Sequence, residues 1–100
     1  MAEYCLTLIC PPAIEEKLLD ALLATAGNEV FTSTPTFGHG TAPGRWSATE
    51  QVMGRSRAMQ VQILLTATEL DRLLARLKTD FPGAGLRYWV SPLSAEGEIA

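Results

Sequence analysis

Residues 37–57 read FGHGTAPGRWSATEQVMGRSR, and this stretch decides how the chain folds around it. It begins where one strand-like segment ends and finishes where another begins. It contains four glycines, a proline, three arginines, one glutamate and the only histidine of the chain. A long polar loop between two strands of a compact domain is uncommon unless it is functional or disordered. We therefore expect any function of the chain to depend on this loop.

Three elements are predicted before the loop. Residues 4–10 (YCLTLIC) are apolar and β-rich, which predicts a strand, and the prolines that follow suit the start of a helix. Residues 14–26 show helical periodicity. The apolar stripe of this helix consists of Ile14, Leu18, Leu19, Leu22, Leu23 and Ala26. Residues 29–37 (EVFTSTPTF) predict a second strand, in which Pro35 marks an edge or a bulge because it cannot donate to a ladder.

Three more elements are predicted after the loop. From Gln51 to Leu65 apolar residues alternate as in a strand. One face carries Met59, Val61, Ile63 and Leu65, and the other carries Ala58, Gln60, Gln62 and Leu64. Thr68 is predicted to cap a second helix. The buried stripe of that helix is Leu70, Leu73, Leu74, Leu77 and Phe81. Residues 85–90 (GLRYWV) predict the last strand, and residues 93–100 a flexible tail.

The element order is βαββαβ, which predicts an α+β, ferredoxin-like fold. Residues 1–100 would form one domain, with a four-stranded antiparallel sheet, two helices on one face and a loop at 38–50 between the second and third strands. The second face of the sheet would carry Gln60, Gln62 and several apolar neighbours. We expect a homo-oligomer that buries this face. The alternative is a monomer whose second face is polar.

Composition excludes several classes of protein. The chain has 100 residues, a net charge of −3 and a pI near 5.0, which argues against nonspecific nucleic-acid binding. The sequence shows neither an apolar run long enough for a membrane-spanning helix nor a secretory leader, so a cytoplasmic location is expected.

Cys5 and Cys10 are five residues apart, which places them on opposite faces of a strand. Both are therefore interpreted as small buried hydrophobic residues.

The motifs around the loop and in the last strand resemble those of PII and PII-like signalling proteins. The residues concerned are Glu50-Gln51-Val52, Gly54-Arg55 and Arg57, followed by Arg87-Tyr88-Trp89-Val90 and Ser91-Pro92. They look like an uncharacterised PII-like family, related to nitrogen regulatory proteins, that is often encoded beside heavy-metal efflux systems. The resemblance covers nearly the whole chain, and it places the 37–57 loop at the position of the T-loop.

The resemblance implies a trimer of ferredoxin-like subunits. Small effectors would bind in clefts between subunits, and the T-loop would report their presence to a partner, such as a membrane transport system. PII proteins hold nucleotide phosphates with a loop ending in Gly-Asp-Gly-Lys, whereas residues 83–87 here read GAGLR. The glycines are present, but the acid and the lysine are not. An adenine nucleotide and a metal ion both stay open as effectors.

Five residues are predicted to contact the effector: Arg55, Arg57, Gly83, Gly85 and Arg87. Arginine offers a planar fork that fits phosphate or carboxylate, and Arg55 and Arg57 share strand parity. The alternative is that these arginines form structural ion pairs. Backbone N–H groups near Gly83 and Gly85 could cradle an anion, or the glycines could simply turn the chain.

The loop itself is predicted to bind the partner, through His39, Arg45, Trp46, Glu50 and Gln51. Trp46 would be an aromatic anchor. His39 is also a candidate metal ligand, as in the related divalent-cation-tolerance family. Zinc needs three or four ligands, so three copies of His39 would have to meet at a symmetry axis. A third hypothesis is a small enzyme with His39 as its base. Because the chain carries neither a nucleophile elbow nor a P-loop, we expect it not to be an enzyme.

Overall fold

The computed structural model describes residues 1–25, 31–39 and 55–100, and for Thr25 and Arg55 it describes the backbone only. The helices and strands follow the predicted βαββαβ order. They are β1 (Tyr4–Cys10), the 3-10 turn η1 (Pro12–Ile14), α1 (Glu15–Thr25), β2 (Phe31–His39), β3 (Arg55–Leu65), α3 (Ala67–Asp80) and β4 (Arg87–Pro92). The ferredoxin-like architecture predicted from the sequence is thereby confirmed.

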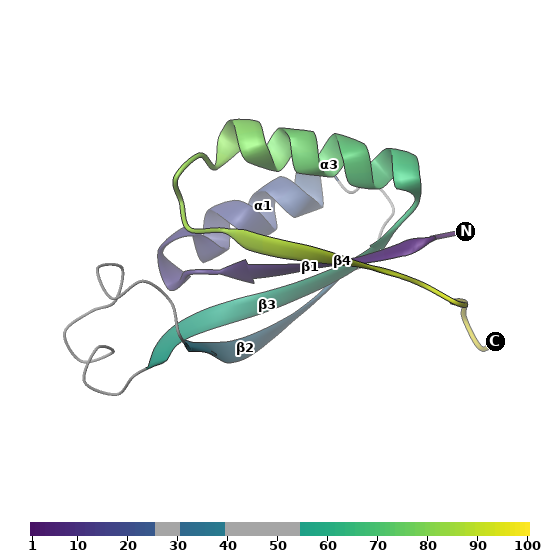
Figure 1. Cartoon of the computed structure of the whole chain (residues 1–100), viewed down its shortest axis with the longest axis horizontal. Coiled ribbons are helices and arrows are strands. Elements are labelled where there is room, and N and C mark those ends of the chain that lie inside the picture. The colour runs from purple at the N-terminus through teal and green to yellow at the C-terminus, as the bar shows by residue number, and fades with distance from the viewer. Residues whose placement is uncertain (26–30, 40–54) are drawn as a thin grey trace.

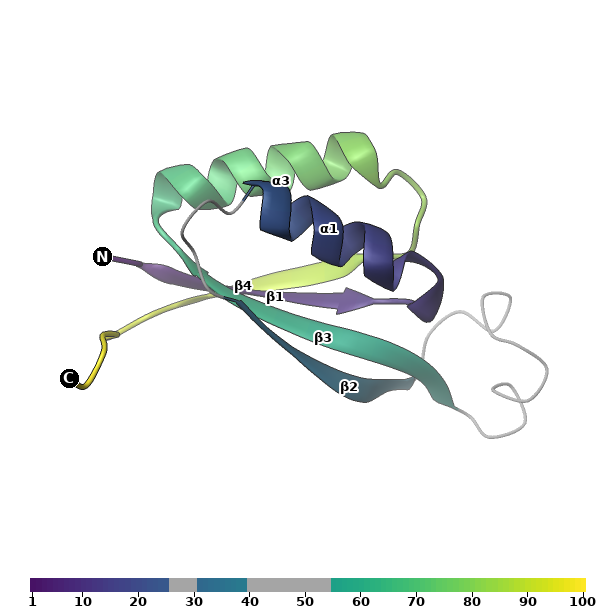
Figure 2. The same cartoon turned by 180° about the vertical axis from the view of Figure 1, so that it is seen from behind.

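The four described strands form one antiparallel sheet in the order β2-β3-β1-β4. In the centre, Leu6 of β1 lies opposite Ile63 of β3 on one side and Val90 of β4 on the other. Both helices lie on the same face of this sheet (Figure 1; Figure 2). The position of β2 at an edge agrees with the prediction from Pro35, because an edge strand tolerates a missing donor.

The hydrophobic core lies between the helices and the sheet. It contains Leu6, Leu8, Cys10, Leu18, Leu22, Met59, Val61, Ile63, Leu65, Leu70, Leu73 and Leu77. Every second residue of β1 and β3 contributes because alternate side chains of a strand point to the same face. Leu23 was predicted to widen the stripe of the first helix, and this was wrong, since its side chain is 68% exposed. Leu22 already occupies the inward position, and the next residue turns about 100° away.

α3 begins two residues earlier than the sequence suggested. Its N-cap is Thr66, whose Oγ1 accepts a hydrogen bond from the Glu69 backbone N–H at 3.2 Å. The Glu69 carboxylate accepts in return from the Thr66 N–H at 2.9 Å. The prediction that Thr68 caps this helix was therefore wrong. The Thr-x-x-Glu spacing of a capping box is met by Thr66 and Glu69, and not by Thr68.

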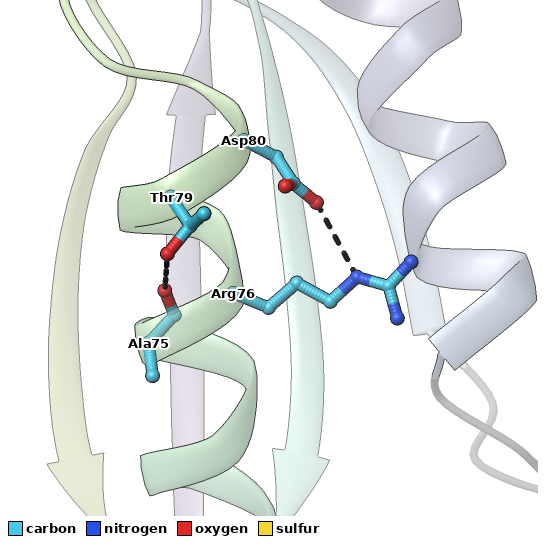
Figure 3. A network of polar contacts seen from close by, with 4 residues as sticks. All are labelled: Ala75, Arg76, Thr79 and Asp80. Atoms are coloured by element: carbon cyan, nitrogen blue, oxygen red, sulfur yellow. Dashed lines mark hydrogen bonds and ion pairs between the residues drawn. The ribbon is translucent and has the colours of Figure 1, made fainter.

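The last turns of α3 are held by local polar contacts (Figure 3). Arg76 Nε lies 3.3 Å from Asp80 Oδ2, and the Thr79 hydroxyl donates to the carbonyl oxygen of Ala75 at 3.0 Å. The Arg76–Asp80 pair is exposed and one helical turn apart, so its contribution to stability is small.

Three strand boundaries differ from the prediction, and one of them is the end of β4, which lies at Pro92 instead of Val90. β4 begins at Arg87 instead of Gly85, because Gly83 and Gly85 take φ angles of +68° and +81°, which belong to a turn. β2 continues to His39, so the first two residues assigned to the loop at 38–50 belong to the strand. The predicted starts of the second strand at Glu29 and the third at Gln51 lie outside the described residues.

The chain termini meet at one end of the sheet. The Glu3 N–H donates to the carbonyl of Leu65 at 3.0 Å, and the Leu93 N–H donates to the carbonyl of Glu3 at 2.9 Å. The Ala2 N–H donates to Glu96 Oε2 at 2.8 Å. These bonds tie residues 93–96 to the start of the chain.

None of the described helices has the length and apolar character needed to cross a membrane.

Candidate functional site

The β2–β3 hairpin extends beyond the rest of the sheet. The pairing of β1 with β3 ends at Cys10 opposite Met59, whereas β2 and β3 stay paired as far as His39 opposite Arg55. We call the paired residues 36–39 and 55–58 the stem. Both views show the stem leaving the sheet at the end where β1 finishes and β4 begins (Figure 1; Figure 2). The stem thus projects past the ends of β1 and β4.

One face of the stem combines an aromatic ring with cationic residues. Phe37 lies opposite Arg57 and His39 opposite Arg55, and these pairs share a face because they are two residues apart along each strand. It is the face that carries Met59 towards the helices. Phe37 is 49% exposed, and Arg57 and His39 are exposed too. By register, Arg55 and Arg57 therefore occupy the same side, as their parity suggested.

The predicted glycine loop lies between α3 and β4. Gly83 and Gly85 both have positive φ, and the Ala84 N–H bonds to the Phe81 carbonyl at 3.4 Å. Arg87 follows this turn and is exposed, on the face of the sheet away from the helices. Its neighbour Tyr88 points the other way, because its ring lies 5.9 Å from Lys78 Nζ of α3.

The predicted effector residues form two groups, Arg55 and Arg57 in the stem and Gly83, Gly85 and Arg87 before and at the start of β4. The two groups lie at one end of the sheet, but their arginines are on opposite faces. Arg57 belongs to the helix face and Arg87 to the open face, and β1 lies between their strands. A single subunit therefore does not bring them together. The predicted loop residues Arg45, Trp46, Glu50 and Gln51 lie outside the described residues.

The face of the sheet opposite the helices is covered by no described element. We call it the open face. Two rows cross it from β4 to β2: Trp89, Thr7, Gln62 and Thr32 form one, and Arg87, Ile9, Gln60 and Thr34 the other. Its β2 side is polar and its β4 side is more apolar. Trp89 is 49% exposed, and Ile9 and Cys5 are half-buried. Sequence reasoning named Gln60 and Gln62 and expected apolar neighbours on this face, and the register identifies Ile9 as one of those neighbours.

The two cysteines behave differently although they share a strand. Cys10 is buried in the core, and its thiol donates to the carbonyl oxygen of Pro11 at 3.2 Å. Burial, and to a smaller extent the carboxylate of Glu15, raises the pKa of Cys10 to about 11. At neutral pH it is a neutral thiol and a poor nucleophile. Cys5 lies on the opposite face and is also free, as the odd spacing predicted. It is only half-buried, so the interpretation of both cysteines as buried was wrong for Cys5.

Residues 1–25, 31–39 and 55–100 contain no cluster of side chains suited to bind a metal ion. Among these residues, no three His, Cys, Asp or Glu side chains gather as ligands for one ion. His39 stands at the end of β2, on the exposed side of the stem. Its role as a metal ligand stays a prediction.

The whole chain, residues 1–100, matches the family described as "Protein of unknown function (DUF3240)". The chain belongs to this family. No curated protein sequence matches it.

Solved structures agree with the fold. A DUF3240 family protein from Shewanella baltica is 20% identical, with a TM-score of 0.79, and the match covers 100% of this chain and 99% of that one. A protein of Thermus thermophilus, provisionally named a PII-like signalling protein, is 19% identical with a TM-score of 0.65, covering 93% and 88%. A Bacillus cereus protein related to NIF3 is 18% identical with a TM-score of 0.67, and the match covers 98% of this chain but 27% of that one. At these identities the likeness concerns the fold.

Proposed function

We propose that this DUF3240 protein is a PII-like regulatory protein of the cytoplasm that assembles as a trimer. A small anionic effector would bind between subunits, and the 37–57 loop would report its presence to a partner protein. The PII-like fold and the motifs of β3 and β4 support this proposal. It assigns no catalytic step to the chain.

One observation carries the proposal. The predicted effector residues lie at one end of the sheet, but Arg57 and Arg87 are on opposite faces of it. Residues that cannot meet within a subunit can meet across an interface, where Arg87 of one copy approaches the stem of the next. The open face supplies the interface, since it carries Trp89 and Ile9 without a covering helix.

The chemistry of these residues favours an anion. Arginine forks bind phosphate or carboxylate through paired hydrogen bonds, and the turn at Gly83 and Gly85 could add backbone N–H donors. An adenine nucleotide is the first effector to test. The partner would be a transport system, such as a heavy-metal efflux complex, as the sequence resemblance suggests. The effector would act by binding one arrangement of the loop better than another.

The assembly is tested by a charge placed on the open face. Gln62 lies in the middle of that face, next to Thr7. Gln62→Lys should shift the mass measured by light scattering from trimer towards monomer, weakening association by about a hundredfold, because it forces like charges together in a desolvated interface. Thr68→Lys, on the exposed surface of α3, is the matched control. A wild-type protein that is monomeric at about 100 μM, well above the Kd of a stable assembly, would overturn the trimer.

The effector is tested by calorimetric titration with ADP, ATP and cyclic AMP. Arg57→Ala and Arg87→Ala should each weaken binding by about tenfold or more, the loss of a charged hydrogen bond. Arg76→Ala removes an equal charge from α3 and should leave binding unchanged. Absence of binding by all three nucleotides would remove the adenine nucleotide from the proposal. The alternative that His39 binds a metal is tested by calorimetric titration of Zn²⁺ into the wild type and into His39→Ala.

A further inference from the structure

We propose that Trp89 stacks on the base of an adenine nucleotide whose phosphates are bound by Arg87, so that β4 supplies both contacts of the effector site. This inference rests on the proposed function, which places an anionic effector beside Arg87 between subunits. It adds the residue that would select a nucleotide over a simple anion.

Arg87 and Trp89 lie next to each other at the margin of the open face. They are two residues apart on β4, opposite Ile9 and Thr7 of β1, and they share this face because alternate residues of a strand do. Two residues of a strand span about 7 Å. This spacing suits a nucleotide, in which the sugar separates the base from the phosphates.

The side chain of Trp89 is available for stacking in the subunit. It is 49% exposed, and Arg87 is exposed as well. Tyr88, which lies between them in the sequence, belongs to the other face, where its ring lies 5.9 Å from Lys78 Nζ. An indole ring on an uncovered sheet offers a flat apolar surface on which a nucleobase can stack.

The position of β4 places this ring in the proposed cleft. β4 is an edge strand of the sheet, so Trp89 and Arg87 lie at its margin and not in its middle. The cleft of the proposed assembly forms where Arg87 approaches the stem of the next copy. Trp89 would line the same cleft, and the base would lie between its ring and the neighbouring subunit.

The charge of the sheet favours an anion at this margin. None of the 11 acidic residues of the chain falls within the described strands. Among the described strand residues of the open face, Arg87 is the only charged side chain. A phosphate bound there would meet no carboxylate on this face. The net charge of −3 for the whole chain argues against a polynucleotide, so the occupant is a single nucleotide.

The order of residues along the chain sets the direction of the bound nucleotide. The turn that contains Gly83 and Gly85 precedes Arg87, and Trp89 follows it. The phosphates would therefore lie towards the turn, where backbone N–H groups can join the guanidinium. The base would lie further along β4, over Trp89.

The emission of Trp89 tests the stacking directly. Trp46→Phe leaves Trp89 as the only tryptophan of the full chain. This variant is titrated with ADP and, for comparison, with inorganic pyrophosphate, which has two phosphates but no base. ADP should quench the emission of Trp89 and bind at least about tenfold more tightly than pyrophosphate, because stacking adds to the contacts of the phosphates.

Substitutions on β4 separate stacking from packing. Trp89→Leu should weaken ADP binding, measured by calorimetry, by at least about tenfold, whereas Trp89→Phe keeps a ring and should weaken it less than about threefold. Tyr88→Leu removes a ring that is 46% exposed on the opposite face and should change binding less than about twofold. Trp89→Leu should keep the mass of the assembly, because leucine preserves an apolar side chain.

Three results would overturn the inference. They are ADP binding that leaves the emission of Trp89 unchanged, equal affinity of Trp89→Leu and the wild type, and loss of the assembly in both Trp89 variants. The last would show that the ring packs against protein of the next copy. In each case the wild type still binds ADP, so the proposed function stands. A wild type that binds no ADP would remove this stacking contact together with ADP as the effector.

Discussion

The two faces of the sheet differ in how their side chains are buried. On the helix face, residues 6–10 of β1 and 59–65 of β3 present only apolar side chains, and Leu6, Leu8 and Val61 are at most 1% exposed. On the open face the same strands carry Cys5, Thr7, Ile9, Gln60 and Gln62, and no described element covers them. Only Thr7 among these five is buried, at 3% exposed. The comparison teaches that the fold of one subunit depends on the first face, while the second face is the one on which the proposed assembly relies.

The largest expected effect separates the faces within β1. Leu6→Ala should lower the free energy of unfolding by about 2–5 kcal/mol, because it leaves a cavity in the core. Ile9→Ala, on the open face, should cost about 1 kcal/mol or less in a monomeric subunit and more at high protein concentration, where the assembly forms. Urea unfolding at two protein concentrations measures both. Equal losses that do not depend on concentration would contradict the division between the faces.

A smaller effect concerns Cys10, the cysteine of β1 that is buried in the core. Its folded pKa of about 11 lies above the ordinary value of 9.0, so the folded protein holds the thiol proton more tightly than the unfolded chain. The stability from this group is complete below about pH 9 and is lost as pH rises towards 11, by up to about 2–3 kcal/mol. Denaturation of the wild type and Cys10→Ala across this range isolates the contribution. Identical slopes in the two proteins would disprove it.

The smallest effect concerns the helix that covers the apolar face. Thr66→Ala should lower stability by about 1 kcal/mol, because it removes the acceptor for the Glu69 N–H at the start of α3. Thr68→Ala removes the same atoms at the second residue of the helix and should stay within about 0.5 kcal/mol. Thermal melting followed by circular dichroism compares them. A larger loss in Thr68→Ala would restore the cap that the sequence first suggested.

Much of the fold could be predicted from local pattern. Alternation in residues 4–10 and 58–65 and helical periodicity in 70–81 identified the elements, because each period reflects burial on one face. The errors arose where two local signals competed. Thr66 and Thr68 are both good caps, and only the bond to Glu69 selects the first. Leu22 and Leu23 are equally apolar, and the packing of α1 buries just one of them.

The candidate site was predictable only in part. The shared parity of Arg55 and Arg57 follows from the alternation of any strand. The separation of Arg57 from Arg87 depends on strand order and register, which link residues 30 positions apart in the sequence. Such pairing is decided by the whole sheet, because a shift of one residue would reverse every face.

The sequence by itself determined the βαββαβ order of a ferredoxin-like domain, and it predicts a long, arginine-bearing loop between the second and third strands. Hydrophobic period and turn residues act locally, so they can be identified without the fold. Only the tertiary structure decided that β2 runs on to His39, that Phe37 and Arg57 share a face of a projecting stem, and that Arg87 lies on the other side of the sheet. These features depend on which strands become neighbours, and that choice is made by the packing of the whole core.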